Sequence, residues 1–548
     1  MTISEWLRNK ILRFLKIDHL SESPNAQRLT YINSDDDIRI SELLENKVWY
    51  VAKDSEILNY YTGEMVFGYY KNPIYNRNNR QWFWGQSSKE CEIKRIHTGL
   101  ARAIVNTLVN AIGSPIIKIG CDKGISTDAI EKAKQQNDKL KKILEFNDFN
   151  TKCNQEQMPL TMVEGDGAWK IIIDKDFCKY PILQYYDAEN VEYIEKYGKI
   201  IGIVFRDYYK DDKGRDYIKF ETRRISTDGD SIIEHDLFRL TKSNELVPAD
   251  LSDIPELADL KPLVIPKLNK IFAVPCRYFY NPTYPKRGLS IYNGKLGLFD
   301  MLDEIYSQLS QTNRVSTPVE YYSVDVLEHD SKGNPILPAK YNRQFIQKQG
   351  VPDGDGVNKN KDIETTQPQL NFTQYLEAAR GVMDMIFTGQ LSPATLGIDV
   401  AKKDNADAQR EKEKVTMMTR NNIIDRQTAV DKELCTLLLM AQEFIDTGSI
   451  SIVEYDISVK FNEFANPSFE EELASLGAAR TQGNMSPRMF IELLYGDNIS
   501  DEEKEKEIKY IEEHDQQDQF NLGNVMGSMS DESEESTKPT NTEPGQEE

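Results

Sequence analysis

Apolar side chains recur every three or four residues in two separate stretches of the chain, residues 289–313 and 372–389. This spacing places them on one side of an α-helix, so each stretch predicts an amphipathic helix that packs against a partner. Residues 315–370, between them, alternate short β-prone runs with loops rich in Gly, Asp, Asn and Lys. The positions expected to pack the two helices are Leu289, Tyr292, Leu296, Phe299, Leu302 and Tyr306 in the first, and Phe372, Leu376, Met383 and Ile386 in the second.

A third helical pattern follows a loop in which Ser392, Pro393 and Gly397 exclude continuous helix. From residue 405 the sequence predicts a helix of about 40 residues, several times the usual length of about 11–12 in globular proteins. Asp404 or Asn405 can cap its first turn. The first half is mostly charged and the second half carries enough apolar residues for a packed side. A helix of this length is typical of ring-forming and channel-forming assemblies.

The remaining sequence predicts an α+β protein. Residues 160–280 alternate β-rich runs with turn signals such as Asp228–Gly229, which indicates an antiparallel β-region. Residues 31–95 mix short helices and strands and contain the aromatic cluster Trp82, Phe83 and Trp84. Such a cluster can stack nucleotide bases, but a packed hydrophobic anchor is the favoured interpretation.

The net charge of −22 is distributed unevenly over the 548 residues. Residues 497–548 contain 17 acidic and 4 basic residues, and the end from about residue 515 has too few apolar residues to fold, so we expect disorder. An acidic body disfavours tight binding to DNA phosphates, but it suits a channel through which DNA slides. Residues 1–30 contain a basic amphipathic helix, which docks on protein or, in the alternative, lies on a membrane surface.

Signals for catalysis and cofactors are weak. The six cysteines show no CxxC spacing and no nearby histidine, so zinc is not expected and buried, reduced thiols are. No apolar run reaches the roughly 20 residues that span a bilayer. The stretch Gly288–Lys295 lacks the spacing of a phosphate-binding loop, and the five histidines form no HExxH motif. We therefore expect no cofactor, no metal and no catalytic residues.

The order of these segments resembles the portal proteins of tailed double-stranded DNA bacteriophages. The sequence LSPATLG at 391–397, followed by the long charged helix, is similar to the segment that joins helices in that family. Three further stretches resemble the early wing helix, the wing β-region and the C-terminal part: HTGLARAIVNTLVNAIGSPI at 97–116, YYDAENVEYIEKYGKIIGIVFRDYY at 185–209, and FNEFANPSFEEELASLGAARTQGNMSP at 461–487. Together they cover most of residues 31–510, and their order carries more weight than any single motif.

The resemblance implies a multidomain ring subunit with a mixed α/β wing, a two-helix stem, a small strand-containing clip, a long spine helix and a helical crown. The implied divisions are an N-terminal amphipathic segment at 1–30, the wing at 31–285, the first stem helix at 286–315, the clip at 316–370, the second stem helix at 371–390, a tunnel loop at 391–404, the long wing helix and a strand at 405–466, crown helices at 467–514 and the acidic tail at 515–548.

In function, the resemblance implies a closed ring of about twelve copies at one capsid vertex of the virion, assembled in the host cytoplasm. Genomic double-stranded DNA is packaged and ejected through it without sequence specificity. The implied partners are the large terminase subunit, which supplies the motor, a head–tail adaptor, the major capsid protein and a scaffold, with no membrane contact. The alternatives are another virion structural component, such as a tail connector or scaffold-like assembly protein, and thirdly a nucleic-acid enzyme.

Two groups of residues are expected to make the contacts. Lys402 and Lys403 form a basic pair that a ring repeats as a collar, although they also suit solvated positions before a helix N-terminus, where its dipole disfavours them. The residues expected to face DNA are Leu391, Ser392, Pro393, Thr395, Gly397, Asp399, Lys402, Lys403 and Asp404. Those expected to dock the motor and adaptor are Lys348, Asp353, Asp355, Lys359 and Lys361 in the clip.

Overall fold

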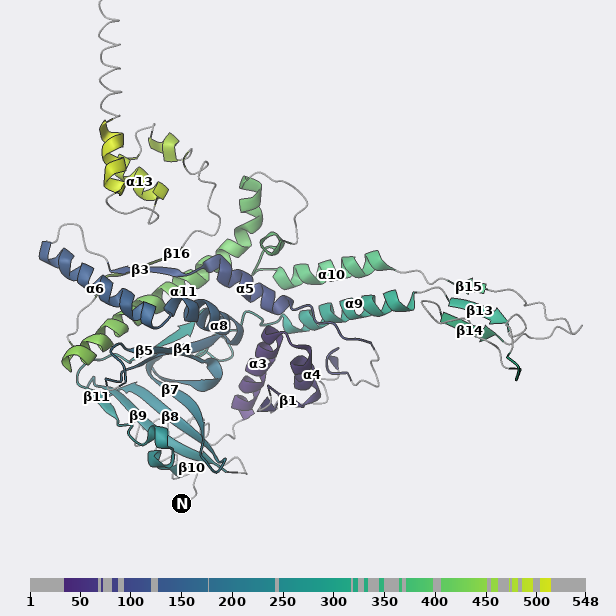
Figure 1. Cartoon of the computed structure of the whole chain (residues 1–548), viewed down its shortest axis with the longest axis horizontal. Helices are drawn as coiled ribbons and strands as arrows, with labels where there is room; N and C mark the ends of the chain where they lie inside the picture. Colours follow the sequence, from purple (N-terminus) through teal and green to yellow (C-terminus); the bar gives the residue numbers. More distant parts are fainter. Residues whose placement is uncertain are drawn as a thin grey trace, which may run out of the picture. The chain divides into compact units, whose positions relative to one another are not determined.

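A computed structural model gives the structure of the protein (Figure 1). The chain divides into two compact units, Met1–Asn462 and Glu463–Glu548, and the first mixes helices with sheets, in agreement with the predicted α+β class. The segments expected at 1–30 and 515–548 lie outside the described residues. The residues described are 34–67, 70–71, 81–86, 93–119, 127–175, 177–241, 246–316, 319–323, 330–333, 344–348, 364–366, 371–397, 406–450, 455–461, 473, 476–480, 485–495 and 503–513.

The helices of the first unit form where apolar residues recur at helical spacing. The helix at 100–112 is an example, because its buried side chains follow steps of three and four from Ala101 to Ile112, and Gly113 ends it at a φ of 72°. The helices are α3 (Ser34–Val51), α4 (Asp54–Thr62), α5 (Leu100–Ile112), α6 (Thr127–Phe146), α7 (Phe149–Lys152), the π-helix η3 (Cys153–Gln157), α8 (Met158–Glu164), α9 (Leu296–Val315), α10 (Phe372–Phe387) and α11 (Ala406–Thr447), with short 3₁₀ turns η4 (Ala188–Asn190), η5 (Leu251–Asp253), η6 (Pro255–Leu257) and η8 (Pro393–Leu396).

The β-region predicted at 160–280 forms two antiparallel sheets. The three-stranded sheet has the order β12 (Ala273–Arg277), β4 (Asp166–Ile172), β5 (Ile182–Asp187). The six-stranded sheet has the order β10 (Leu246–Ala249), β9 (Ser231–Leu240), β8 (Asp216–Ile225), β7 (Lys199–Lys210), β6 (Val191–Lys196), and β11 (Leu263–Ile265) also pairs with β9. In this sheet, Tyr197 and Gly198 form the turn between β6 and β7. Their φ values of 52° and 76° are the left-handed pair that suits a tight hairpin.

Three smaller sheets complete the described strands of the first unit. β16 (Ile457–Phe461) returns from the long helix and pairs antiparallel with β3 (Pro115–Ile119). The sheet between α9 and α10 pairs β13 (Val319–Ser323) in parallel with β14 (Gln344–Lys348) and antiparallel with β15 (Glu364–Thr366). The third is a short hairpin of β1 (Met65–Val66) and β2 (Tyr70–Lys71).

The long helix α11 has 42 residues and contacts α5, α6, β12 and β16 (Figure 1). Its second half buries Leu434, Leu437, Leu438 and Ala441 completely. The packed side that the sequence predicts for this half is therefore present. Packing of this side, more than intrinsic helix preference, holds the helix in place.

The aromatic cluster at residues 82–84 is part of the main core. Phe83 and Trp84 are buried, and the ring of Trp82 stacks on Tyr61 at a centroid distance of 5.0 Å. Buried rings are not available to stack on nucleotide bases, so the favoured interpretation of a packed anchor agrees with the structure.

The start of the first predicted stem helix is corrected. Residues 289–295 are turns and α9 begins at Leu296. Gly294 has a φ of 73°, and the amides of this stretch bond elsewhere: Leu289 N donates to Phe279 O and Ile291 N donates to Met162 O. Tyr292 therefore packs from a turn, where its hydroxyl donates to Ala101 O at 2.7 Å.

In the second unit, α13 (Pro487–Tyr495) is amphipathic. Its buried residues Phe490, Ile491 and Leu494 pack with Ile508 and Ile511 of a helical stretch at 503–513. Both helical stretches lie within the range 467–514, whose assignment as a crown remains a prediction.

A buried polar cluster joins α11 to the main core of the first unit. Gln427 and Asp431 are fully buried, and Nε2 of Gln427 donates to Oδ1 of Asp431 at 2.7 Å. Oε1 of Gln427 accepts from the Tyr278 hydroxyl at 2.7 Å and from Nε2 of Gln157 at 3.1 Å. Oδ2 of Asp431 has no hydrogen-bond partner among the described residues. Burial raises the pKa of Asp431 to about 8, and the Gln427 hydrogen bond opposes this rise.

We predict that Asp431→Asn flattens the pH dependence of stability. The raised pKa means that the native state keeps a proton that the unfolded chain has released, so stability falls as pH rises from about 4 to about 8. Asparagine copies the neutral acid and removes this contribution. Thermal unfolding between pH 5 and 8.5 should show a smaller decline of Tm in Asp431→Asn, and the wild-type decline in Asp425→Asn, which changes an exposed residue of the same helix. Equal declines in wild type and Asp431→Asn would contradict the prediction.

Candidate functional site

The candidate site is a helical hairpin, α9 and α10, and the segment from which it rises. α9 leads to the sheet of β13, β14 and β15, and α10 returns beside it (Figure 1). The two helices contribute buried residues to one core, and near the strand end the hydroxyls of Thr312 and Tyr375 lie 3.3 Å apart. The buried residues include Phe299, Leu302 and Ile305 in α9 and Ala379, Val382, Ile386 and Phe387 in α10.

A fully buried carboxylate, Asp303, fixes the hairpin near its root, which is the end where α9 begins and α10 ends. Its Oδ2 accepts from Nε1 of Trp84 at 3.0 Å and lies 2.7 Å from Nδ1 of His97. Its Oδ1 accepts from the amide and the hydroxyl of Thr98 at 2.9 and 2.8 Å. One turn earlier, Asp300 accepts from the backbone amides of Phe83 and Trp84. Because hydrogen bonds from residues 83–84 and 97–98 satisfy these two carboxylates, the orientation of α9 relative to those residues is fixed.

The segment just before α9 and the end of α10 are also joined directly. Nζ of Lys295 donates to the carbonyls of Met385 and Thr388 at 2.9 and 3.1 Å, at the C-terminal end of α10. Nε2 of Gln390 donates to Ile291 O at 2.7 Å. A cation at terminal helix carbonyls is favourable because those groups lack partners within the helix.

Most predicted stem positions lie in or against the hydrophobic core. Tyr292, Phe299, Leu302 and Ile386 are buried, while Leu296, Tyr306 and Met383 are partly buried against them; Leu289 and Leu376 are half-buried. Phe372 is 48% exposed in the single chain, so its predicted packing role remains a prediction. Ala379, which has the same spacing as the predicted positions of the second helix, is buried as well; Ile305, Val382 and Phe387 are buried but were not predicted.

The predicted tunnel loop is only partly exposed. Leu391 and Ser392 are buried, and the Ser392 amide donates to Oγ1 of Thr416 at 2.8 Å. The Thr395 and Thr416 hydroxyls are also 2.8 Å apart, so these residues attach η8 to α11. The prediction that Leu391 and Ser392 face DNA is therefore corrected. Pro393 opens η8 and Gly397 ends it at a φ of 72°. Outside the described residues lie Asp399, Lys402, Lys403 and Asp404.

The predicted docking residues belong mostly to parts of the insert that the structure does not describe. Lys348 is the last residue of β14, opposite Ser323 of β13. Asp353, Asp355, Lys359 and Lys361 lie outside the described residues.

Large apolar side chains remain exposed on the hairpin. They occur at both ends of each helix, and the most exposed is Met385 at 60%. The others are Met301, Val315 and Phe372. Met301 and Met385 lie nearer the start of α9 and the end of α10, and Val315 and Phe372 lie at the ends that lead to the sheet.

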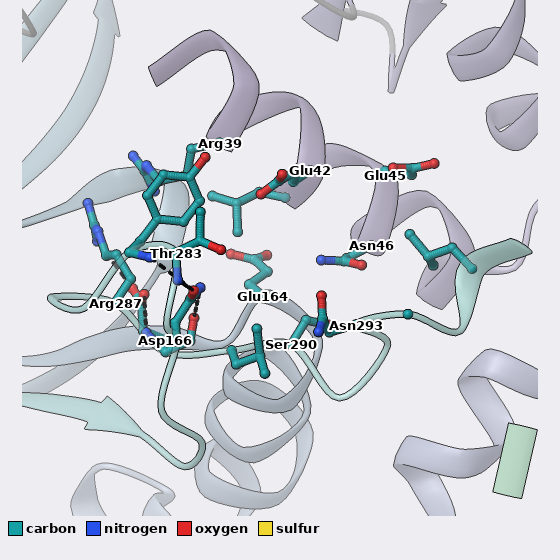
Figure 2. A pocket seen from close by; sticks show the side chains of 17 residues that line it. Arg39, Glu42, Glu45, Asn46, Glu164, Asp166, Thr283, Arg287, Ser290 and Asn293 are labelled. Atoms are coloured by element: carbon teal, nitrogen blue, oxygen red, sulfur yellow. Dashed lines mark hydrogen bonds and ion pairs between the residues drawn. The ribbon is translucent and has the colours of Figure 1, made fainter. Parts of the chain in front are cut away.

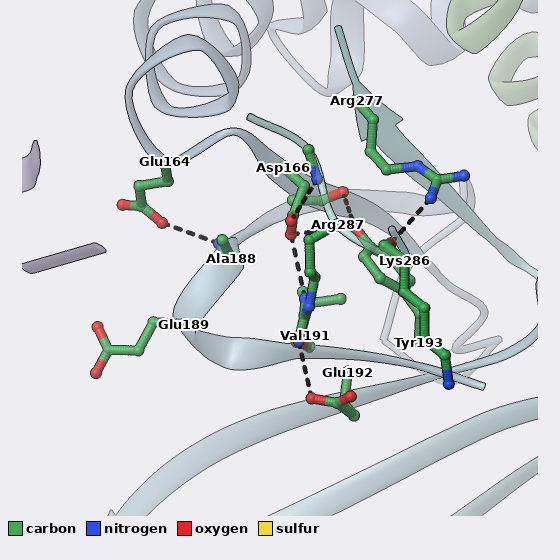
Figure 3. A network of polar contacts seen from close by, with 12 residues as sticks. Glu164, Asp166, Ala188, Glu189, Val191, Glu192, Tyr193, Arg277, Lys286 and Arg287 are labelled. Atoms are coloured by element: carbon green, nitrogen blue, oxygen red, sulfur yellow. Dashed lines mark hydrogen bonds and ion pairs between the residues drawn. The ribbon is translucent and has the colours of Figure 1, made fainter. Parts of the chain in front are cut away.

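An ion network lies beneath the segment that leads into α9. Arg287 is buried between Asp166 and Glu192, with N–O distances of 3.2 and 2.8 Å (Figure 3). Oδ2 of Asp166 accepts from the amide of Gly288 at 3.1 Å. A side chain at Gly288 would collide with the carbonyl of Gly165, so this close approach of two backbones requires glycine. Sequence patterns did not reveal this network, because its members are far apart in the chain.

A pocket of about 190 Å³ lies beside this network, between α3 and residues 281–296 (Figure 2). Its lining includes Glu42, Glu45 and Glu164. Burial raises the pKa of Glu164 to about 8 and that of Glu45 to about 7. Among the described residues no group of three or more His, Cys, Asp or Glu side chains is placed to hold a metal ion. The described helices also include none long and apolar enough to cross a membrane.

No protein-family model and no curated protein matches the chain. Among solved structures, it is similar to a chain described as "Neck of native GTA particle computed with C12 symmetry". The similarity covers 76% of this chain and 92% of that chain, with 12% sequence identity and a TM-score of 0.32. With identity and TM-score both this low, neither the fold nor the role of that protein transfers to this chain.

We predict that Asp303→Ala destabilises the protein by about 3–5 kcal/mol, because it leaves buried donors of Trp84 and Thr98 without their acceptor. Urea unfolding followed by tryptophan fluorescence measures the change. Asp384→Ala, at an exposed position of α10, should stay within about 0.5 kcal/mol of wild type. A loss for Asp303→Ala as small as that of the control would show that the carboxylate does not fix the root.

Proposed function

We propose that the protein is a portal protein: a ring at one capsid vertex of a tailed bacteriophage, through which double-stranded DNA is packaged and ejected. The observation that supports this most is the hairpin. Two paired helices carry a small sheet at their far end, keep a buried root, and expose Met301, Met385 and other large apolar side chains. The long helix α11 and the order of sequence segments support the same proposal.

The exposed hairpin suits a closed ring of identical copies. In a head-to-tail ring each subunit presents one surface to a neighbour and a different surface to the other neighbour, so α9 of one copy can pack on α10 of the next. Contacts of this kind would cover apolar side chains that water surrounds in a single copy. We propose about twelve copies, as the family resemblance implies.

The remaining roles follow from a position at the capsid vertex. We propose that the sheet of β13–β15 and its loops dock the large terminase subunit and later a head–tail adaptor, and that the capsid protein and scaffold surround the ring. We propose no catalytic activity, since packaging energy comes from the terminase. Nucleotide release from DNA by the purified protein with a divalent metal would instead favour a nucleic-acid enzyme.

A tail connector or scaffold-like assembly protein is the alternative structural role. It has no need for a hairpin that projects a docking sheet. Particles assembled without this protein distinguish the two roles: capsids that still take up DNA but lack tails would favour the connector, and capsids that take up no DNA would favour the portal.

We predict that Met385→Glu prevents ring formation without unfolding the subunit. The residue is exposed in the single chain, so the substitution should leave Tm close to wild type, while a charge buried at a subunit contact is strongly unfavourable. Electron microscopy should show rings for wild type and for Met65→Glu, a matched change at another exposed methionine, and few or none for Met385→Glu. Normal rings in Met385→Glu would exclude this part of α10 from the contact, and wild-type protein without rings would contradict the portal proposal.

We predict that changing both Lys402 and Lys403 to Glu reduces the DNA retained per particle and leaves rings intact. The pair would form a positive collar that holds phosphates weakly and without sequence preference. Genome content per particle, measured by quantitative PCR after nuclease treatment, tests this. Changing Lys141 and Lys142 of α6 to Glu makes the same change of charge elsewhere. Full genomes in the Lys402/Lys403 variant would exclude the DNA contact.

A further inference from the structure

The pocket at the hairpin root combines carboxylates with apolar walls. Figure 2 shows Glu164 at the end of α8 extending toward α3, which carries Glu42, Glu45 and Asn46. Leucine side chains from α3 and from the segment before α9 also line it, so the space has an acidic part and an apolar part. Its volume of about 190 Å³ is enough for a ligand of a few heavy atoms.

Arginine side chains and carboxylates form an ion network at one end of the pocket. Arg287 pairs with Asp166 and Glu192, and Arg39 interacts electrostatically with the same two carboxylates. Arg206 also lies 3.9 Å from Glu192, so three guanidinium groups face two carboxylates in this network. This end of the pocket therefore carries the cationic groups, and a cationic ligand would bind at the opposite end.

The other end of the pocket has more carboxyl groups than ammonium groups. Lys47 pairs with both Glu164 and Asp187, at 3.5 and 2.9 Å, so one cation faces two carboxylates. Glu42 and Glu45 of α3 add two more carboxyl groups to the lining. When Glu164 and Glu45 are ionised, this end favours a positively charged ligand.

Glu164 has unused capacity to accept hydrogen bonds. Its side chain is 1% exposed, and Oε2 accepts from the amide of Ala188 at 2.9 Å. Oε1 has no hydrogen-bond partner within the described part of the chain, because the Lys47 ammonium makes its hydrogen bond to Asp187. A buried carboxylate oxygen without a hydrogen bond is costly, and a donor entering the pocket would satisfy it.

We propose that this pocket binds an alkylammonium cation, whose ammonium group lies beside Glu164 and Glu42. The methylene chain then packs against three leucines that line the pocket, Leu43, Leu289 and Leu296. A divalent metal ion is a poorer occupant, because the described carboxylates do not converge as a metal-ligand set. An ammonium group with an apolar chain matches both parts of the lining, since such chains bury their methylenes and keep the charge at a polar end.

The chemistry has two sources, a free diamine or a lysine side chain of a second copy of this chain. The test uses the full-length protein and 1,4-diaminobutane, with 1,4-butanediol as a neutral molecule of the same length and sodium chloride at equal ionic strength. Binding to the native state raises Tm by mass action. We expect a saturable rise in Tm with the diamine alone. A rise no larger than that with sodium chloride would overturn the proposal.

Variants locate the site. Glu164→Gln keeps an oxygen for the Ala188 amide but removes the charge, so the apparent Kd for diaminobutane should rise at least tenfold. Glu42→Gln, at an exposed position, should also weaken binding without affecting folding. Glu131→Gln, exposed on α6 and outside the pocket lining, should bind as wild type. Equal affinity in all three variants would place diamine binding elsewhere and overturn the proposal.

The pH dependence provides an independent check. Glu164 faces Lys47 of α3, Asp187 of β5 and Glu189 of η4, while Arg39 and Arg287 line the network end. Burial, with a smaller contribution from Asp187, raises the pKa of Glu164 to about 8. An ammonium ion binds its ionised form, so affinity should increase by about tenfold per pH unit as pH rises toward 8. Affinity that is constant from pH 6 to 8 would contradict a contact with Glu164.

Sedimentation in the presence of the diamine identifies the source. If a free diamine is the natural ligand, assemblies persist while Tm rises. If a lysine of a second copy occupies the pocket, the diamine competes with it and shifts assemblies toward monomers. Both outcomes support an alkylammonium site. Loss of rings in Met385→Glu with diamine binding unchanged would separate this site from the proposed ring function.

Discussion

The hairpin depends on one buried carboxylate. Asp303 lies wholly inside the first unit and takes donors from Trp84 and Thr98, with His97 also in contact. Removing a carboxylate from water is costly unless several donors replace its hydration, and here a separate segment supplies them. The direction of α9 is therefore linked to residues more than 200 positions earlier in the chain, and Lys295 extends this constraint to the end of α10.

Apolar spacing predicted the helices but not all their ends. The long helix and α10 follow the predicted pattern, because their buried positions repeat at a constant period. The start of α9 was wrong by several residues: Leu289 and Tyr292 fit the helical spacing, yet Gly294 and the local amide partners form turns. Spacing reports which side chains are apolar, and it carries no information about where backbone amides bond.

The candidate site was less predictable than the fold. Ser392 and Pro393 correctly marked a break in the helix, but such residues do not reveal which way the chain turns. Leu391 and Ser392 are buried, and the Ser392 amide donates to Thr416. The pocket could not be predicted, because its acidic residues come from α3 and α8 and its apolar wall partly from the segment before α9. Charged residues on separate elements have no common period, so only the tertiary structure brings them together.

The pocket and the hairpin share the segment at 281–296. Leu296 is the first residue of α9 and also lines the pocket, while Lys295 beside it donates to the end of α10. A ligand in the pocket would contact α3 and this segment together, so it would bind the assembled root more tightly than a loosened one. By mass action, that preference stabilises the hairpin root without touching Met385 or the other exposed residues proposed to meet a neighbouring copy. The stability of the hairpin root and the contact between copies therefore depend on different residues of the same two helices.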